Sequence, residues 1–201
     1  MNVRAVAFDL GGVLTHTAFG GLERYCAEAG LPAATLTGYF RGHPMMARLE
    51  VREITSRDFL KFVCIDTERT HGIRLDIHEL ARAAAEGERL NPDMLELVAE
   101  VRATCATALL TNNVAEAGWR ESLPFDLFDH VVDSSAVSLR KPDPRIYRLL
   151  LELLGTEPAE TAFVDDLPDN LVPAREMGIT AIQFTGLERC RDELIRLGVL
   201  A

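Results

Sequence analysis

The sequence predicts an α/β protein with a doubly wound parallel sheet and an inserted all-helical segment. Short apolar runs of strand length alternate with helical patterns over most of the chain, as in consecutive βαβ units. The stretch from Phe19 to about Glu88 interrupts this alternation and contains helical patterns only. The chain has 201 residues, of which 48% are hydrophobic. This length suffices for one full domain plus an insertion, with a core that needs no disulfides.

Five segments are predicted as strands. The first covers residues 3–10 and stops at Gly11-Gly12, which is typical of a buried parallel strand followed by a glycine-rich loop. Three further apolar runs lie at residues 107–111, 161–164 and 180–184, and a weaker one lies at 130–133.

Helices are predicted between these strands from their start and stop residues. In the core they begin at Asn91-Pro92-Asp93 and cover residues 144–154, 168–177 and 187–197, with proline near three starts and glycine after three ends. In the insertion they cover residues 19–29 and 56–68, and a third begins at Asp76. We therefore expect an α/β core of residues 1–15 and 89–201 and a helical cap of residues 16–88.

Charge and cysteine content narrow the function classes. The chain has 21 basic and 31 acidic residues, a net charge of −10, which argues against a broad nucleic-acid surface. An anionic substrate would then need a local positive centre, such as a metal ion or a placed lysine. The four cysteines form no CxxC pair, and no apolar run is long enough for a membrane span. We expect reduced thiols and a cytoplasmic protein with no nucleic-acid or membrane partner.

Polar residues follow several of the predicted strands. Asp9 ends the first, Thr111-Asn112 the second, and Asp165-Asp166 the fourth, while Lys141 lies in the loop after the weak strand. Ligands of open α/β sheets gather at the carboxyl ends of strands, so these groups are expected to converge. The three carboxylates repel one another and need a cation, and Mg²⁺ together with Lys141 would neutralise them. Oxygen ligands without a nearby His or Cys cluster favour magnesium over zinc.

Four motifs resemble those of the haloacid dehalogenase-like (HAD) hydrolase superfamily. They are Phe8-Asp9-Leu10-Gly11-Gly12-Val13-Leu14, Leu110-Thr111-Asn112, Arg140-Lys141-Pro142-Asp143-Pro144-x-Ile146-Tyr147 and Phe163-Val164-Asp165-Asp166-x-x-x-Asn170. They occur in the family order and span nearly the whole chain. The resemblance implies a Rossmann-like core, and the helical insertion is similar to the family's helical cap of the first type.

The resemblance also implies roles for individual residues. Asp9 would be the nucleophile that forms an aspartyl phosphate. Asp9, Asp166 and the Gly11 carbonyl would ligate Mg²⁺, and Asp165 would hold a metal-bound water. Thr111 and the Asn112 region would bind phosphoryl oxygens, and Lys141 would neutralise the nucleophile and the transferring group.

One position departs from the pattern. Most phosphatases of this superfamily carry a second aspartate two residues after the nucleophile, and this chain has Gly11, as in a branch with an Asp-x-Gly-x-Val motif. Without this general acid, worth roughly 10²–10⁴-fold, activity would be slow or would need another donor. Thr15, His16 and His43 are candidate donors, although both histidines fit ordinary loop positions better.

The expected function is Mg²⁺-dependent hydrolysis of a small phosphorylated metabolite by a monomer or homodimer. One alternative is a non-catalytic or regulatory HAD-like binding protein. A metal-independent 2-haloacid dehalogenase is a further alternative, but that branch carries an aromatic residue in place of Gly11 and lacks the Asp165-Asp166 pair. On the cap, Arg41, Arg48 or Arg52 could contact the substrate, although a solvated charged helix face explains them equally well. The sequence names no substrate.

Overall fold

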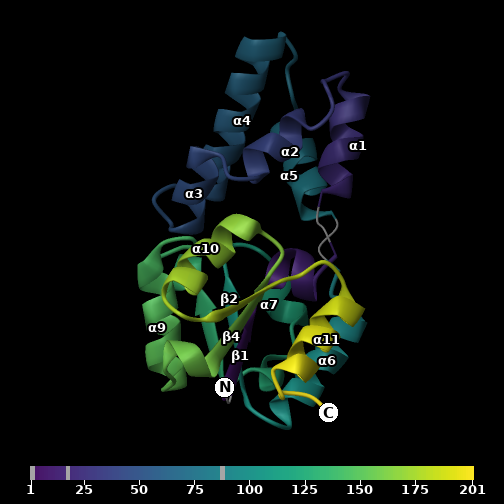
Figure 1. Cartoon of the computed structure of the whole chain (residues 1–201). Coiled ribbons are helices and arrows are strands. Elements are labelled where there is room, and N and C mark those ends of the chain that lie inside the picture. The colour runs from purple at the N-terminus through teal and green to yellow at the C-terminus, as the bar shows by residue number, and fades with distance from the viewer. Residues whose placement is uncertain (1–2, 17–18, 87–88) are drawn as a thin grey trace.

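The computed structural model describes residues 3–16, 19–86 and 89–201, which form two units, one above the other (Figure 1). The lower unit is built on a sheet of five parallel strands in the order β3-β2-β1-β4-β5. The strands are β1 (Ala5–Phe8), β2 (Ala106–Thr111), β3 (His130–Asp133), β4 (Thr161–Asp165) and β5 (Thr180–Gln183). The strand order reverses at β1, so the crevice for a ligand lies at the carboxyl end of this central strand.

Helices cover both faces of the sheet. On one face α6 (Pro92–Arg102) and α11 (Leu187–Arg196) pack on a hydrophobic cluster that includes Phe8 and Val164. On the other face α9 (Pro144–Leu154) and α10 (Pro168–Glu176) pack on a cluster that includes Leu110 and Phe163. All four residues of β1 are fully buried, which explains why this strand is an uninterrupted apolar run.

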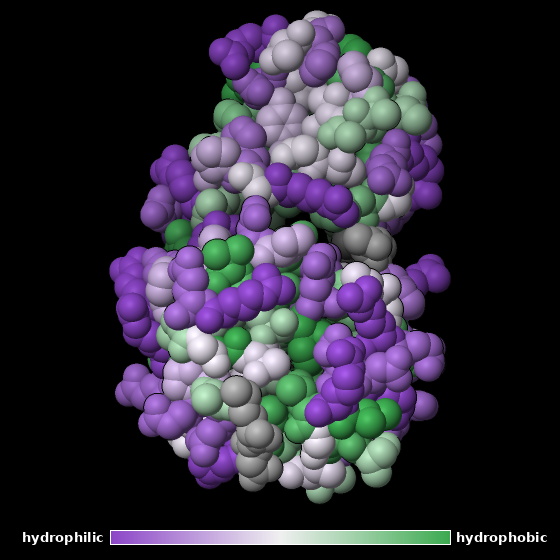
Figure 2. Space-filling model, in the orientation of Figure 1, coloured by the Kyte–Doolittle hydropathy of each residue, from purple (hydrophilic) through white to green (hydrophobic). Residues whose placement is uncertain are grey.

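The upper unit is the helical insertion. It consists of α1 (Gly20–Glu28), α2 (Thr35–Phe40), α3 (Pro44–Glu50), α4 (Ser56–His71) and α5 (Ile77–Ala85), which enclose a hydrophobic cluster of their own. Thr55 and Asp58 form a reciprocal capping box at the start of α4, and Asp76 caps α5. The space-filling view shows the cap as a separate lobe that meets the core across a narrow waist (Figure 2).

Two chain segments connect the cap to the core side by side. Thr15 and Leu90 form an isolated antiparallel bridge, and the His16 N–H donates to the Arg89 carbonyl at 2.9 Å. The expected boundaries at 15/16 and 88/89 stay predictions, because residues 17–18 and 87–88 lie outside the described residues.

The five predicted strands and the doubly wound topology are confirmed. The first strand is shorter than predicted, because Asp9 ends it and Leu10 begins a wide helical turn, η1 (Leu10–Leu14). The short helices α2, α3, α7 (Trp119–Ser122) and α8 (Ser134–Val137) were not predicted individually, since each has at most two turns and little periodicity. Within the described residues, no helix is both long and apolar enough to cross a membrane.

Candidate active site

The site lies where β1, β2 and β4 end, below the cap. Asp9 directly follows β1 and is 6% exposed. Its Oδ1 accepts the Leu10 N–H at 2.7 Å, so the aspartate caps the turn that follows it. Its Oδ2 accepts no hydrogen bond from any described residue. One carboxylate oxygen is therefore fixed by the backbone, and the other is available to a ligand.

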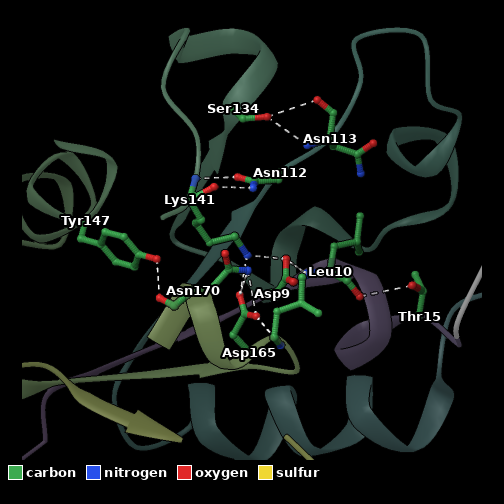
Figure 3. A network of polar contacts seen from close by, with 11 residues as sticks. Asp9, Leu10, Thr15, Asn112, Asn113, Ser134, Lys141, Tyr147, Asp165 and Asn170 are labelled. Atoms are coloured by element: carbon green, nitrogen blue, oxygen red, sulfur yellow. Dashed lines mark hydrogen bonds and ion pairs between the residues drawn. The ribbon is translucent and has the colours of Figure 1, made fainter. Parts of the chain in front are cut away.

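Lys141 lies between two aspartates and is fully buried. Its ammonium contacts Asp9 Oδ1 at 2.8 Å and Asp165 Oδ2 at 2.7 Å (Figure 3). These contacts use two of its three donors, and no described residue accepts from the third. A buried lysine is stable only when it is paired in this way. Its charge thus stands directly beside the Asp9 carboxylate.

Asp165 is held on all sides. Asn170 donates its amide to both carboxylate oxygens at 3.0 Å, and the Leu167 N–H donates to Oδ1 at 2.8 Å. The Tyr147 hydroxyl in turn donates to the Asn170 carbonyl. Asp165 therefore acts as a rigid anchor for Lys141.

The three carboxylates lie close enough to share a metal ion. Asp9, Asp165 and Asp166 each present a ligand atom within 4.8 Å of the others. Gly12 makes this possible: its φ is +74°, and a Cβ there would lie 2.6 Å from Asp166 Oδ2. Only glycine allows the loop after β1 to approach Asp166 so closely.

Burial and repulsion set the protonation of these groups when no metal is bound. Burial raises the pKa of Asp9 to about 8, against the charge of Lys141 and with the help of Asp165. Burial and Asp165 also raise the pKa of Asp166. For Lys141, burial lowers the pKa, but the charges of Asp9 and Asp165 outweigh it and raise the pKa. The cluster therefore has an excess of negative charge that favours a cation.

Thr111 and Asn112, both expected to contact a phosphoryl group, behave differently. Thr111 ends β2 with its hydroxyl buried, and none of the residues that the structure describes forms a hydrogen bond with that hydroxyl. The Asn112 side chain instead grips the Lys141 backbone, accepting its N–H at 2.8 Å and donating to its carbonyl at 2.9 Å. The Asn112 side chain thus positions Lys141, and the expected contact of the Asn112 region with phosphoryl oxygens stays a prediction.

Gly11 has room for a side chain. Its φ and ψ are −66° and 123°, a region open to any residue, and an added Cβ would meet no atom within 4 Å. None of the three expected substitute donors, Thr15, His16 and His43, forms a hydrogen bond with Asp9. The Thr15 hydroxyl donates to the Leu10 carbonyl, and His43 caps α3 between the rings of Tyr39 and Phe62. His16 is exposed in the segment that connects core and cap.

The structure separates the three arginines expected on the cap. Arg48 forms an exposed ion pair with Glu53. Arg52 adopts a left-handed backbone conformation and is exposed. Arg41 lies over the Phe19 ring at 4.4 Å, and its positive charge lowers the pKa of Asp166 against the effect of burial. Of the three, Arg41 is the one whose charge opposes the raised pKa of Asp166.

Four residues of the surrounding network were not predicted to have a role. They are Glu50, Asn113, Ser134 and Asn170. Asn170 lies within the fourth motif, four residues after Asp166, and Glu50 lies in the cap segment between Arg48 and Arg52, both of which were expected near the substrate. No periodicity or spacing singles out Asn113 and Ser134.

Comparison with known protein families decides the affiliation. The family model of the haloacid dehalogenase-like hydrolases matches residues 3–178. The chain belongs to the haloacid dehalogenase-like hydrolase family. Its four motifs therefore lie in an enzyme of the hydrolase class, and the predicted resemblance is confirmed.

Some curated relatives of this hydrolase match over nearly their whole length, and others are much longer than this chain. Phosphatase MT3486 of Mycobacterium tuberculosis is 30% identical over 98% of this chain and 94% of its own length. Bifunctional epoxide hydrolase 2 of Sus scrofa is 32% identical over 96% of this chain. The hydrolase spans only 38% of that protein and 19% of mouse acyl-CoA dehydrogenase family member 10.

Solved structures share the fold of this hydrolase. A predicted HAD-like hydrolase from Porphyromonas gingivalis superposes with a TM-score of 0.73 at 23% identity, covering 98% of this chain and 99% of its own. A HAD family enzyme from Bacteroides thetaiotaomicron, in complex with magnesium and inorganic phosphate, gives 0.67 at 21% identity, with coverages of 90% and 94%. At these identities the likeness concerns the fold.

Proposed function

We propose that this hydrolase is a Mg²⁺-dependent phosphatase that acts on a small phosphorylated metabolite through a phosphorylated Asp9. The observation that carries the proposal is the juxtaposition of Asp9, whose Oδ2 accepts no hydrogen bond from a described residue, with the Lys141 ammonium and the acid cluster. A phosphoryl group needs a nucleophile, neutralisation of its charge and donors for its oxygens. Asp9, Lys141 and the buried Thr111 hydroxyl meet these needs.

The residues present fit magnesium. The clustered donors are the carboxylate oxygens of Asp9, Asp165 and Asp166, and this is the ligand chemistry that Mg²⁺ prefers. Burial and the neighbouring Asp165 raise the pKa of both Asp9 and Asp166, and a bound cation would stabilise their charged forms. Asp9, Asp166 and the Gly11 carbonyl would hold the ion directly and Asp165 through a water. The bound ion would neutralise the phosphoryl oxygens.

The chain's own residues account for the transfer. Asp9 Oδ2 attacks phosphorus, the bond between phosphorus and the leaving oxygen breaks, and a water later hydrolyses the acyl phosphate to free Asp9 and phosphate. Lys141 offers its third N–H to the transferring group, and Thr111 offers its hydroxyl. Because Gly11 carries no acid, the leaving group departs with little help from the residues next to Asp9.

Relatives support the same chemistry. Phosphatase MT3486, whose name states a phosphatase, matches nearly its full length, and the Bacteroides enzyme with a similar fold binds magnesium and inorganic phosphate. The Asp165-Asp166 pair disfavours the metal-independent dehalogenase, and the pairing of Asp9 with Lys141 beside two further carboxylates disfavours a non-catalytic or regulatory role. The four free cysteines agree with a reducing compartment such as the cytoplasm.

A metabolite screen tests the proposal. Phosphate release is measured for aryl phosphates, sugar phosphates and acyl phosphates, with Mg²⁺ and with excess chelator, and with Asp9→Asn as the blank. We expect turnover that requires both Mg²⁺ and Asp9. Equal turnover in chelator would instead favour the dehalogenase, to be checked with 2-haloacids. No turnover of any substrate, together with no Mg²⁺-dependent stabilisation by beryllofluoride, would favour the non-catalytic alternative.

A further inference from the structure

A partly buried ion pair connects the cap to the core beside the catalytic lysine. Glu50, the last residue of α3 in the cap, accepts a hydrogen bond from Arg140 Nε in the core at 2.6 Å. The Glu50 side chain is 10% exposed and that of Arg140 is 29% exposed. Burial raises the pKa of Glu50, while Arg140 opposes this effect. A carboxylate in such a place is stable only while its partner stays in contact.

The backbone of the same residue makes a second contact with the core. The Ser134 hydroxyl, at the start of α8, donates to the Glu50 carbonyl at 2.8 Å. The Ser134 hydroxyl oxygen also accepts the Asn113 N–H at 3.0 Å (Figure 3). Ser134 is fully buried. Asn113 belongs to the loop that follows Thr111. Glu50 therefore contacts, directly or through Ser134, both loops that carry the expected phosphate-binding groups.

The ion pair of Glu50 with Arg140 is linked through the backbone to Lys141, whose ammonium contacts Asp9. Arg140 immediately precedes Lys141, whose backbone is gripped on both sides by the Asn112 amide. Asn112 and Asn113 are consecutive, so the β2 loop holds Lys141 with one residue and Ser134 with the next. A displaced Arg140 side chain would release one support of a loop that must place Lys141 Nζ within 2.8 Å of Asp9.

We propose that Glu50 is a positioning residue: when the cap docks, Glu50 binds Arg140 and Ser134 and thereby fixes Lys141 against the nucleophile. The proposal rests on the phosphatase function proposed above. Lys141 reaches its catalytic position only while Glu50 is in place, so the cap contributes to the chemical step in addition to covering the substrate. Misplacement of a catalytic group by about 1 Å costs up to about 100-fold in rate.

Another cap–core contact offers a matched control. The Ser56 hydroxyl of α4 donates to Glu116 Oε2 at 2.8 Å, where Ser56 is half-buried and Glu116 is exposed. Loss of this bond weakens cap docking without touching Arg140, Ser134 or Lys141. It separates a general effect of docking from the specific effect of Glu50.

The test compares kcat, KM and local amide exchange in Glu50→Gln, Arg140→Gln, the double variant and Ser56→Ala. With a small aryl phosphate, we expect Glu50→Gln and Arg140→Gln to lower kcat by about 10- to 100-fold with little change in KM. The double variant should be no slower than the slower single variant, because the two side chains act as one unit. Ser56→Ala should keep the wild-type kcat.

Amide hydrogen exchange gives a readout that needs no turnover. The segments 112–115 and 139–143 should exchange faster in Glu50→Gln than in wild type, and the helices of the core should be unchanged. Arg140→Gln, at the more exposed partner, provides the same comparison if Glu50→Gln fails to fold.

Several outcomes overturn the proposal. These are an unchanged kcat in both single variants, additive losses in the double variant, an equal loss in Ser56→Ala, or unchanged exchange in the two segments. A wild-type protein that hydrolyses no phosphate ester refutes the phosphatase function. The exchange measurement then still decides whether Glu50 orders the Lys141 loop.

Discussion

The replacement of Gly11 by aspartate tests whether this position lacks a proton donor. Gly11 has φ and ψ of −66° and 123°, and a Cβ added there meets no atom within 4 Å. The substitution is therefore free of backbone strain and of clashes. Loss of glycine flexibility in the unfolded chain should stabilise the fold by about 0.4–1 kcal/mol.

The new carboxyl would follow Asp9, one of the three clustered carboxylates, by two residues, and repulsion between like charges would raise its pKa. A raised pKa keeps the group protonated near neutral pH, as a general acid requires. For alkyl phosphates, whose leaving groups carry charge poorly, we expect Gly11→Asp to raise kcat/KM by up to about 100-fold. For aryl phosphates with acidic phenols the gain should be small.

The assay is a series of aryl and alkyl phosphates with leaving groups of graded pKa. Wild type should show a steep decline of log kcat/KM with leaving-group pKa, and Gly11→Asp a flatter one. Gly11→Ala and Gly11→Asn supply the Cβ and the shape without the acid. Melting curves with and without Mg²⁺ verify folding and metal binding first. An equally steep decline in a folded, Mg²⁺-binding Gly11→Asp protein would refute the reasoning.

Four further predictions concern the nucleophile and its acidic neighbours. Gly12→Ala places a Cβ 2.6 Å from Asp166 Oδ2 at a φ of +74°, so it should cost about 1 kcal/mol or more and weaken Mg²⁺ binding, and calorimetry showing wild-type affinity would contradict this. Asp9→Asn should fold and leave below a few per cent of wild-type turnover, whereas higher residual phosphate release would argue against covalent catalysis. In the folded metal-free protein, burial raises the pKa of Asp9 from the ordinary 3.8 to about 8. Chelator-treated protein should therefore lose stability as pH rises between these values, and the melting temperature of Asp9→Asn should depend less on pH. Phosphate release should stop in chelator and be inhibited by Ca²⁺, whose looser coordination does not suit the site; activation by Ca²⁺ would contradict the expected octahedral geometry.

The alternation of apolar runs and helical patterns was sufficient to predict the sheet. Buried parallel strands such as β4 are continuous apolar segments, and their ends are marked by polar residues such as Asp165. The short cap helices were harder to predict from the sequence. Helix α2 begins after Ala34 in a left-handed conformation and has no side-chain cap, so its start carries no signal in the sequence.

The charged centre of the site was predictable for the same reason, because topology alone brings the carboxyl ends of β1, β2 and β4 together. The roles of polar side chains around it were not. An asparagine side chain after a strand can bind a ligand or a neighbouring loop, and the structure shows that Asn112 binds the Lys141 backbone. The Glu50–Arg140 pair joins remote segments, and the sequence contains no periodicity that would connect them.

The central position of β1 has a consequence for the order in which the molecule is assembled. Ala5 pairs on one side with Ala106 and on the other with Thr161, so the strand that presents Asp9 finds its first partner only after the whole cap has been synthesised. The cap has its own hydrophobic cluster and can collapse locally during translation. Within the core, β1 therefore stays unpaired until β2 has been synthesised, and for that time its apolar run Ala5–Phe8 has no strand partner.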